Sequence, residues 1–338
     1  MHLKDDMDQQ IDFVITWIDG QNEAWRKEKS MFQPDRRDDD QEARYRDWGL
    51  LKYWFRGVDK FAPWVRKIHF ITWGYVPEWL NTGNPRLHVV QHKDYVPEQY
   101  LPVYNSNVLE IYMHRIEGLA EHFVYFNDDM FLIRNVRPSY FFRHGQPCDM
   151  LAFQPVVANP ANPLMSHLYL NNTLALSRHF VKRENIRRQP GKYFNLRYPP
   201  LYFFYNLLEL AFPLYTGFYT VHGPSPFCKS TFEEVWEKER EALEEMSFNR
   251  FRSEGDLTPY LFREWQKLSG RFYPWNIRKD FRYFGVGSDN TRLLRTISRQ
   301  RKRVICINDT VSHSEFESAD TQLKAAFQQI LPERSAFE

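Results

Sequence analysis

Residues 122–129 read HFVYFNDD, an apolar and aromatic run that leads directly into an amide and two carboxylates. Residues 122–126 have the length and composition of a buried strand, and the polar side chains begin where that strand would end. The same order recurs at residues 11–20, IDFVITWIDG, where a β-branched apolar run ends at Asp19. We therefore expect acidic side chains at the ends of two separate strands.

The segments around these runs alternate in type. Residues 67–73 and 87–91 resemble strands, whereas residues 50–61 and 106–119 have helical spacing, the latter with Ser106 as the expected N-cap. Strands that alternate with helices are typical of βαβ units, so we predict an α/β fold with a mostly parallel central sheet and flanking helices. Ligands of such sheets bind beyond the carboxyl ends of the strands, so the two acidic segments should face one crevice.

The chain changes character after Cys148. Residues 155–163 are rich in Pro and Asn and form a candidate boundary, and the half beyond it is expected to be mainly helical. Helices are predicted at 231–245, 258–268 and 322–330, and a short strand at 304–307. We predict an α/β core over 1–150, a mainly helical region over 151–303, and a strand and helix over 304–338 that return to the core.

Composition and motifs exclude several classes of protein. Lys and Arg total 45 against 43 Asp and Glu, and this balance argues against nucleic acid as the main partner. The three cysteines are far apart in sequence, which argues against a disulfide framework and fits a reducing compartment. Residues 1–10 are polar and unlike a signal peptide, so we expect a cytoplasmic protein. A P-loop, a GxGxxG fingerprint and an HExxH motif are all absent.

Asp128 and Asp129 are the strongest local signal. Adjacent carboxylates repel each other unless a cation or solvent screens them, and hard oxygen ligands suit Mg²⁺ or Mn²⁺. The alternative is a simple turn, since Asn and Asp are common turn residues. We favour the metal interpretation because residues 130–133 are apolar again and leave the acids in a crease. Asn308 and Asp309 repeat the pattern after residues 304–307, and alone they favour a turn.

Two loops carry further candidates. His222 precedes Gly-Pro, where the chain bends and the ring is often exposed, so it could be a general base or a hydrogen-bonded structural residue. Arg252 lies in a loop of mixed charge and could clamp a phosphate, although a solvated helix end is the simpler interpretation. The basic run 178–197 could meet a phosphate-rich acceptor or a lipid surface, but a solvated face is favoured. We expect the aromatic stretch 198–219 to be core rather than membrane contact.

Together these segments resemble the Stealth family of sugar-1-phosphate transferases. Four conserved regions of that family have similar counterparts here, in order. The first is similar to residues 11–20. The second is the longest and most specific, and it includes LPVYNSNVLE at 101–110 and EHFVYFNDDMFL at 121–132. The third is similar to 222–236 and 250–261, and the fourth to 306–309 with 332–338.

The resemblance implies the reaction and the partners. A nucleotide-activated sugar would donate its sugar-1-phosphate to a hydroxyl of a polysaccharide or lipid-linked oligosaccharide, with release of the nucleoside monophosphate and with Mg²⁺ or Mn²⁺ as cofactor. Residues 1–150 would bind donor and metal, and residues 151–303 would serve the acceptor. The protein would work in the cytoplasm, and peripheral contact with the inner face of the cell membrane stays open.

The resemblance also implies a set of site residues. His222 would accept the acceptor's proton, Arg252 would hold the transferring phosphoryl group, and Asp19 and Asp128 would complete the catalytic group. Two further sets are expected to bind substrate or metal. The substrate-binding set is Arg46, Asp47, Asn105, Asn107, Glu110, Asn127 and Asp256, and the metal-binding set is Asp128, Asp129, Asn308 and Asp309.

Two other functions are considered. A metal-dependent glycosyltransferase would share the α/β fold and the acidic motif but would release a nucleoside diphosphate. A scaffold that binds sugars or polyphosphates without turnover would use the aromatic residues and the basic run. It ranks last, because it does not require two acidic strand ends facing one cleft.

Overall fold

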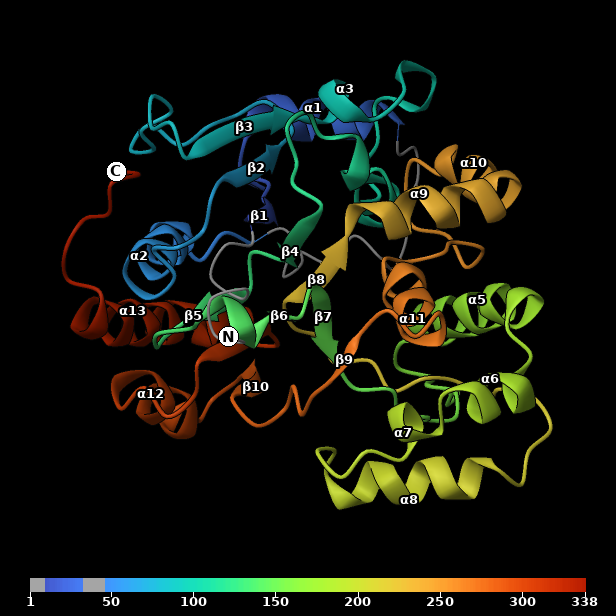
Figure 1. Cartoon of the computed structure of the whole chain (residues 1–338). Coiled ribbons are helices and arrows are strands. Elements are labelled where there is room, and N and C mark those ends of the chain that lie inside the picture. The colour runs from blue at the N-terminus through green and yellow to red at the C-terminus, as the bar shows by residue number, and fades with distance from the viewer. Residues whose placement is uncertain (1–9, 33–45) are drawn as a thin grey trace.

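A computed structural model describes residues 10–32 and 46–338 (Figure 1). The charged run 36–40, whose composition favours a solvated surface, and the polar segment 1–9, which is unlike a signal peptide, lie outside the described residues. The helices are α1 (Glu23–Phe32), α2 (Leu51–Phe61), α3 (His92–Tyr95), α4 (Ser106–Ile111), α5 (Pro163–His179), α6 (Lys182–Arg188), α7 (Pro190–Tyr193), α8 (Pro200–Glu209), α9 (Lys229–Lys238), α10 (Arg240–Ser247), α11 (Tyr260–Leu268), α12 (Thr291–Ser298) and α13 (His313–Ile330).

The main sheet has five strands in the order β3-β2-β1-β4-β8. β1 lies between β2 and β4 in parallel, β3 extends the parallel set, and only β8 runs antiparallel, so the predicted α/β fold with a mostly parallel sheet is confirmed. Its strands are β1 (Ile11–Thr16), β2 (Ile68–Thr72), β3 (Leu87–Gln91), β4 (His122–Phe126) and β8 (Ser225–Cys228).

Each face of this sheet packs against its own layer. Along β1, Phe13 and Ile15 point into one core with α2 and α13, whereas Val14 points into a second core with α4, α9 and α11. The alternation follows from the two-residue repeat of a strand, and burial on both faces explains why β1 reads as an almost continuous apolar run. The sheet therefore lies in the middle of the molecule (Figure 1).

Two smaller sheets extend this core. One has the order β10-β11-β5, with β11 parallel to β10 and antiparallel to β5, and the other has the order β6-β7-β9. β8 comes from the region 151–303 and completes the main sheet, so that region and the first 150 residues share one sheet. The strands are β5 (Met130–Leu132), β6 (Phe142–Arg143), β7 (Gln146–Asp149), β9 (Tyr273–Pro274), β10 (Phe281–Val286) and β11 (Val304–Asp309).

Several predicted boundaries are wrong. The helix expected over 106–119 ends at Ile111 and is capped by the side chain of Asn105 rather than by Ser106. The helix expected over 231–245 is two helices, α9 and α10, that break at Glu239. β11 extends through Asn308 and Asp309, so these residues belong to the strand instead of following it.

The stretch 198–219, expected to be core, is core only in part, since Tyr198, Tyr202 and Tyr215 are buried. α8 lies at the periphery of the molecule (Figure 1), and several of its apolar side chains are exposed. Among residues 10–32 and 46–338, we find no helix with the length and apolar character needed to cross a bilayer.

Candidate active site

Asp128 and Asp129 lie in the turn that joins β4 to β5. The backbone N–H of Met130 donates to the carbonyl of Asn127 at 3.2 Å and closes this turn. Asp128 keeps contact with solvent, but many protein atoms lie around its carboxyl group. The loss of hydration raises its pKa to about 7, and the negative charges of Asp129 and Asp47 contribute to this rise. The segment is therefore a turn, and it also carries carboxylates that repel each other.

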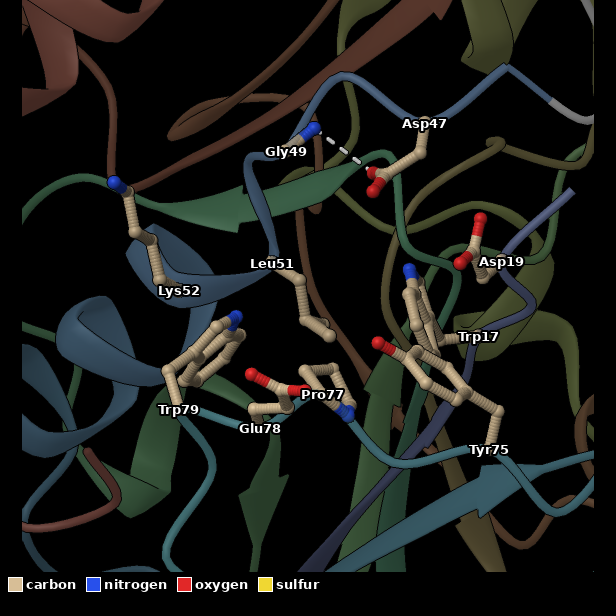
Figure 2. Close-up of a pocket in the computed structure, with 10 residues that line it drawn as sticks. All are labelled: Trp17, Asp19, Asp47, Gly49, Leu51, Lys52, Tyr75, Pro77, Glu78 and Trp79. Atoms are coloured by element: carbon tan, nitrogen blue, oxygen red, sulfur yellow. Dashed lines mark hydrogen bonds between the residues drawn. The ribbon is translucent and has the colours of Figure 1, made fainter. Parts of the chain in front are cut away.

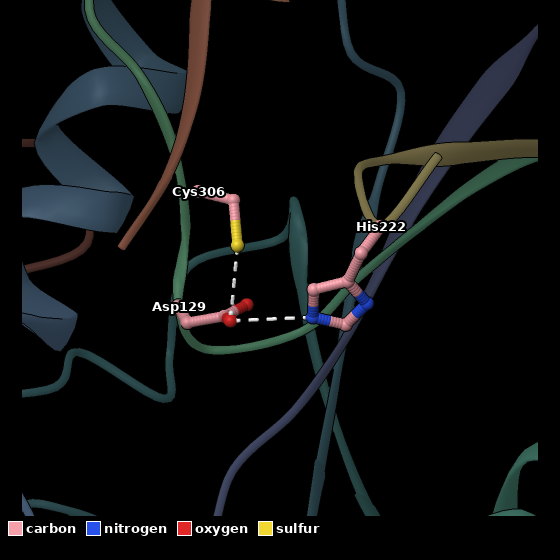
Figure 3. Close-up of side chains that lie close together, drawn as sticks. All are labelled: Asp129, His222 and Cys306. Carbon is pink, nitrogen blue, oxygen red and sulfur yellow. Dashed lines mark hydrogen bonds and ion pairs between the residues drawn. The ribbon is translucent and has the colours of Figure 1, made fainter. Parts of the chain in front are cut away.

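Asp129 meets residues from two distant segments. Figure 3 shows its carboxylate between Cys306 of β11 and His222 of the loop before β8. Its Oδ2 accepts a hydrogen bond from Cys306 Sγ at 3.1 Å and lies 3.3 Å from Nε2 of His222. One ligand atom from each of the three side chains falls within 4.8 Å of the other two. This cluster joins the main sheet to the second sheet.

His222 is held on both ring nitrogens. Its Nδ1 lies 3.0 Å from the hydroxyl of Tyr260, and its Nε2 faces Asp129. Burial alone would lower the pKa of His222, but the hydrogen bond and charge of Asp129 outweigh it, and the pKa is raised above 6.5. The side chain is still 38% exposed. An imidazole that is oriented by an acid and accessible to solvent is suited to general base catalysis.

The acids at this turn fit a hard divalent cation. Asp129 Oδ1 is buried and has no hydrogen-bond partner among the described residues, and the neighbouring Asp128 adds a second carboxylate. Oxygen ligands of this kind suit Mg²⁺ or Mn²⁺. Burial raises the pKa of the Cys306 thiol, which leaves it a neutral hydrogen-bond donor to Asp129.

The four predicted metal ligands do not all converge. Side chains alternate along β11, so Asn308 shares a face with Cys306 and Asp309 points the other way. Asp309 Oδ2 accepts from Nε1 of Trp48 at 3.2 Å and lies 3.6 Å from Nη1 of Arg46. Asp309 and Arg46, expected in the metal and substrate-binding sets, instead pair with each other.

Asp19 and Asp47 line a pocket of about 250 Å³ beyond the carboxyl ends of β1 and β2 (Figure 2). Desolvation and the charge of Asp19 raise the pKa of Asp47, which in turn acts on Asp128. The two strand ends therefore share one acidic edge, as the parallel sheet predicts. The rest of the pocket is aromatic, apolar and charged, lined by Trp17, Gly49, Leu51, Lys52, Tyr75, Pro77, Glu78 and Trp79.

A buried network holds the loop that carries Arg252. The Asn105 side chain donates to Asp256 Oδ2 at 2.7 Å, and Asn107 Nδ2 donates to the same oxygen at 3.3 Å. Because these side chains are buried, they position the loop 249–256 rather than present groups to solvent. Arg252 Nη2 donates to the hydroxyl of Ser106 at 2.6 Å, at the N-terminus of α4.

Glu110 lies on α4 beneath the site. Its Oε1 accepts from the hydroxyl of Tyr125 on β4 at 2.9 Å, and its charge is among those that raise the pKa of His222. Glu110 is buried, so its position is behind the cluster rather than at its surface.

Sequence reasoning missed five residues of the site. Cys306 is not among the predicted site residues, although its place two residues before Asn308 puts both on one strand face. Tyr260 begins α11, and no local pattern connects it to His222, which is 38 positions away. The pocket aromatics Trp17, Tyr75 and Trp79 could be suspected only from their place after the strands.

Acidic side chains beyond the ends of parallel strands, an oriented histidine and an arginine on a neighbouring loop define an α/β enzyme with its candidate active site at one sheet edge. Comparison with known families agrees. Residues 44–149 match the description "Stealth protein CR2, conserved region 2", and residues 221–261 match "Stealth protein CR3, conserved region 3". The chain belongs to the Stealth family, which confirms the resemblance seen in its sequence.

Relatives of similar length accompany this assignment. A capsular polysaccharide phosphotransferase, WcwK, of Streptococcus pneumoniae is 38% identical, over 98% of this chain and 98% of its own. An exopolysaccharide phosphotransferase, cps2G, of Lactiplantibacillus plantarum is 38% identical, over 97% and 96%. A receptor polysaccharide phosphotransferase, WefC, of Streptococcus gordonii is 37% identical, over 98% and 100%.

Proposed function

We propose that this protein transfers a hexose-1-phosphate or N-acetylhexosamine-1-phosphate from a nucleotide-sugar to a hydroxyl of a growing cell-surface polysaccharide. The observation that carries the proposal is the similarity, over nearly the whole chain, to phosphotransferases named for capsular, exopolysaccharide and receptor polysaccharides. The Asp129–His222 pair at the sheet edge supplies chemistry that such a transfer needs.

The reaction breaks a P–O bond and forms another. The acceptor oxygen attacks the phosphorus that bears the sugar, the bond from that phosphorus to the bridging oxygen breaks, and the nucleoside monophosphate leaves. His222 would take the proton of the attacking hydroxyl on Nδ1, the nitrogen that faces the hydroxyl of Tyr260, because Nε2 already donates its hydrogen to Asp129. The carboxylate of Asp129 then stabilises the imidazolium that forms.

Arg252 would hold the transferring phosphoryl oxygens. A guanidinium presents its N–H groups in a plane and can donate two parallel hydrogen bonds to phosphate. The contact of Nη2 with Ser106 fixes one side of this fork, and the buried Asn105–Asp256 contact fixes the loop behind it. Catalysis of phosphoryl transfer rests mainly on such positioning and on charge stabilisation.

A divalent cation, Mg²⁺ or Mn²⁺, belongs to this proposal. Asp128 and Asp129 would hold it, with Asn308 as a third oxygen ligand from the same face as Cys306. When bound, it would neutralise charge on the donor diphosphate. If no cation is bound, Asp129 Oδ1 has no hydrogen-bond partner among the described residues, and the charges of Asp129 and Asp47 act on Asp128 without compensation.

The donor's nucleoside or sugar would occupy the pocket beside Asp19 and Asp47. Trp17 and Tyr75 offer ring faces there, and the carboxylates can accept hydrogen bonds from sugar hydroxyls. Because the described residues that line the pocket include three acids, Asp19, Asp47 and Glu78, and a single lysine, we place the diphosphate outside it, toward the cation site.

The experiment is product analysis. The purified chain is incubated with a panel of nucleotide-sugars, an oligosaccharide from a cell-surface polysaccharide and Mg²⁺, and the products are examined by mass spectrometry. We expect a nucleoside monophosphate and an acceptor that has gained a sugar-phosphate. Release of a nucleoside diphosphate, with gain of a sugar alone, would establish the glycosyltransferase alternative instead.

A further inference from the structure

α8 turns its polar side chains toward the protein. Its buried residues are Tyr202, Asn206 and Glu209, spaced along one helical face. Asn206 is fully buried, where its Oδ1 accepts from the backbone N–H of Phe153 at 2.8 Å and its Nδ2 donates to the carbonyl of Leu151 at 2.9 Å. The polar residues that interrupt this apolar sequence are therefore structural.

The end of α8 is fixed in the same way. Glu209 is buried and pairs with Nζ of Lys182 at 2.8 Å, and it also accepts from the backbone N–H of Thr216. Lys182 Nζ further donates to the carbonyls of Phe212 and Leu214. These contacts fix the rotation of α8, so the side chains on its other face are held in solvent.

That outer face is apolar. Its residues are leucines and phenylalanines that are between 46% and 73% exposed, on α8 and on the turn after it. Exposed apolar patches of this kind on a folded protein mark interaction sites. The members of this α8 face are Leu201, Phe204, Leu207, Leu208, Leu210, Phe212 and Leu214.

Positive charge lies near the α8 face, on α6 and on the loop that precedes α8. Figure 1 shows α6 and α7 directly beside α8, and the Lys182–Glu209 pair ties α6 to it. From residue 185 to residue 232 the only acid is Glu209, which is buried. The exposed bases of α6 and of the loop before α8 are Arg183, Arg187, Arg188 and Arg197, with Glu184 as the one exposed acid among them.

We propose that the α8 face docks this protein on an anionic lipid bilayer. A bilayer interface offers hydrocarbon to leucine and phenylalanine and negative headgroups to arginine at the same place. α8 has 10 residues and so is about 15 Å long, which is too short to cross a hydrocarbon core of about 30 Å. It would therefore lie in the plane of the interface.

A lipid partner is favoured over a protein partner by the chemistry of the face. Leucine and phenylalanine side chains carry no hydrogen-bonding groups, and hydrocarbon requires none. A protein partner would have to combine an apolar groove with an acidic rim of matching shape. This docking is independent of the proposed phosphotransfer, so either can fail alone.

The test is sedimentation of the full chain with vesicles of phosphatidylcholine, with or without phosphatidylglycerol. We expect binding to the anionic vesicles that weakens as salt is added. Phe204→Glu with Leu208→Glu should lower the partition coefficient at least tenfold, and Arg183→Glu with Arg187→Glu should remove the preference for anionic lipid. The matched control is Met31→Glu with Phe248→Glu, two equally exposed residues on α1 and after α10, and it should bind as the parent does.

Circular dichroism of each variant would establish that it is folded. Absence of binding by the parent chain, or equal loss in the control variant, would overturn the proposal. If the α8 variant instead changes only the mass measured by light scattering, the face mediates association between copies of the chain, and the lipid proposal is wrong.

Discussion

The two oxygens of Asp129 lie in different environments. Oδ2 is shared by Cys306 and His222, whereas Oδ1 is buried without a partner among the described residues. A buried acceptor that lacks a partner costs roughly 1–3 kcal/mol, and more when it is charged. A protein would keep such an oxygen where a ligand completes it, which is the physical basis for the cation in our proposal.

Asp128→Asn tests this cation. The folded-state pKa of Asp128 is raised to about 7 by desolvation and by neighbouring carboxylates, so its charge destabilises the fold increasingly as pH rises from about 4 to above 7. Without a divalent cation at pH 8, the variant should therefore melt at a higher temperature than the parent. Mg²⁺ should raise the Tm of the parent but not that of Asp128→Asn, and activity should be lost in this variant and in EDTA.

The control is Asp59→Asn, since Asp59 is a partly exposed carboxylate paired with Arg86 away from the site. Its response to Mg²⁺ should match that of the parent. Full turnover in excess chelator, or an equal Mg²⁺ shift in Asp128→Asn, would contradict the assignment.

Arg252→Lys tests the phosphate clamp. Lysine keeps the positive charge but loses the planar fork, so kcat should fall by roughly 10²-fold with a smaller change in donor KM. Arg250→Lys is the matched control, because Arg250 is exposed two residues away and stacks on Phe32. Equal kinetics for the two variants would make Arg252 a structural residue.

His222→Ala tests the general base. The pKa of His222 is raised above 6.5 by Asp129, so the neutral base is lost, and kcat should fall, as pH drops through that raised value. The variant should lose about 10²–10⁴-fold in kcat and show a flatter acidic limb. His167→Ala, at a half-exposed histidine near Glu254, should keep the parent's profile. Loss of donor binding together with a lowered Tm would indicate a structural role.

At the scale of elements, the sequence predicts a strand or helix correctly where its residue pattern is compatible with one type of secondary structure. The strands β1 and β4 are almost continuous apolar runs, and the acidic residues that follow them lie along one edge of the sheet. The sequence predicts β11 too short, because Asn308 and Asp309 are typical turn residues, but they pair with Gly285 and Val286 of β10.

α8 shows the opposite case. Its apolar composition predicts burial. However, Asn206 and Glu209 bind groups inside the protein, and this orientation of the helix exposes its leucine and phenylalanine side chains to solvent. The candidate active site also depends on contacts between residues that are distant in sequence. The Asp129–Cys306 and His222–Tyr260 contacts join residues 177 and 38 positions apart, which no local pattern specifies.

Gly57→Ala tests the contact between α2 and β5. In most helices this change stabilises, because glycine costs about 0.5–1 kcal/mol relative to alanine. Here a Cβ would lie 2.8 Å from the carbonyl oxygen of Leu132, and a backbone atom cannot easily move away. We expect a loss of roughly 1–3 kcal/mol in thermal or chemical unfolding.

Gly191→Ala in α7 provides the comparison, since a Cβ there would meet nothing within 4 Å. This variant should be neutral or slightly more stable. A Gly57→Ala protein as stable as Gly191→Ala would mean that α2 can shift away from β5 at little cost.

At the scale of the whole molecule, residues near the C-terminus connect the core to the pocket. The ring of Phe337 is fully buried against Phe55, whose own ring contacts Trp79 of the pocket. The carbonyl of Phe337 accepts from the backbone N–H of Asn81 at 2.8 Å. Glu338 forms two hydrogen bonds of 2.7 Å with Arg56 on α2. A change at Phe337 should therefore affect both stability and the pocket that we propose for the donor.

Phe337→Ala should lower the free energy of unfolding by about 3–5 kcal/mol, the usual cost of removing a buried phenylalanine. The variant removes the ring that packs on Phe55, which in turn contacts Trp79 of the pocket, so donor KM should rise several-fold. The kcat should change little, because other elements hold His222 and Asp129. Phe248→Ala, at a ring that is 65% exposed, should change stability by no more than about 0.5 kcal/mol. Thermal unfolding and donor kinetics on the two variants measure both effects. A destabilised Phe337→Ala protein with unchanged donor KM would separate the pocket from this packing and argue against it as the donor site.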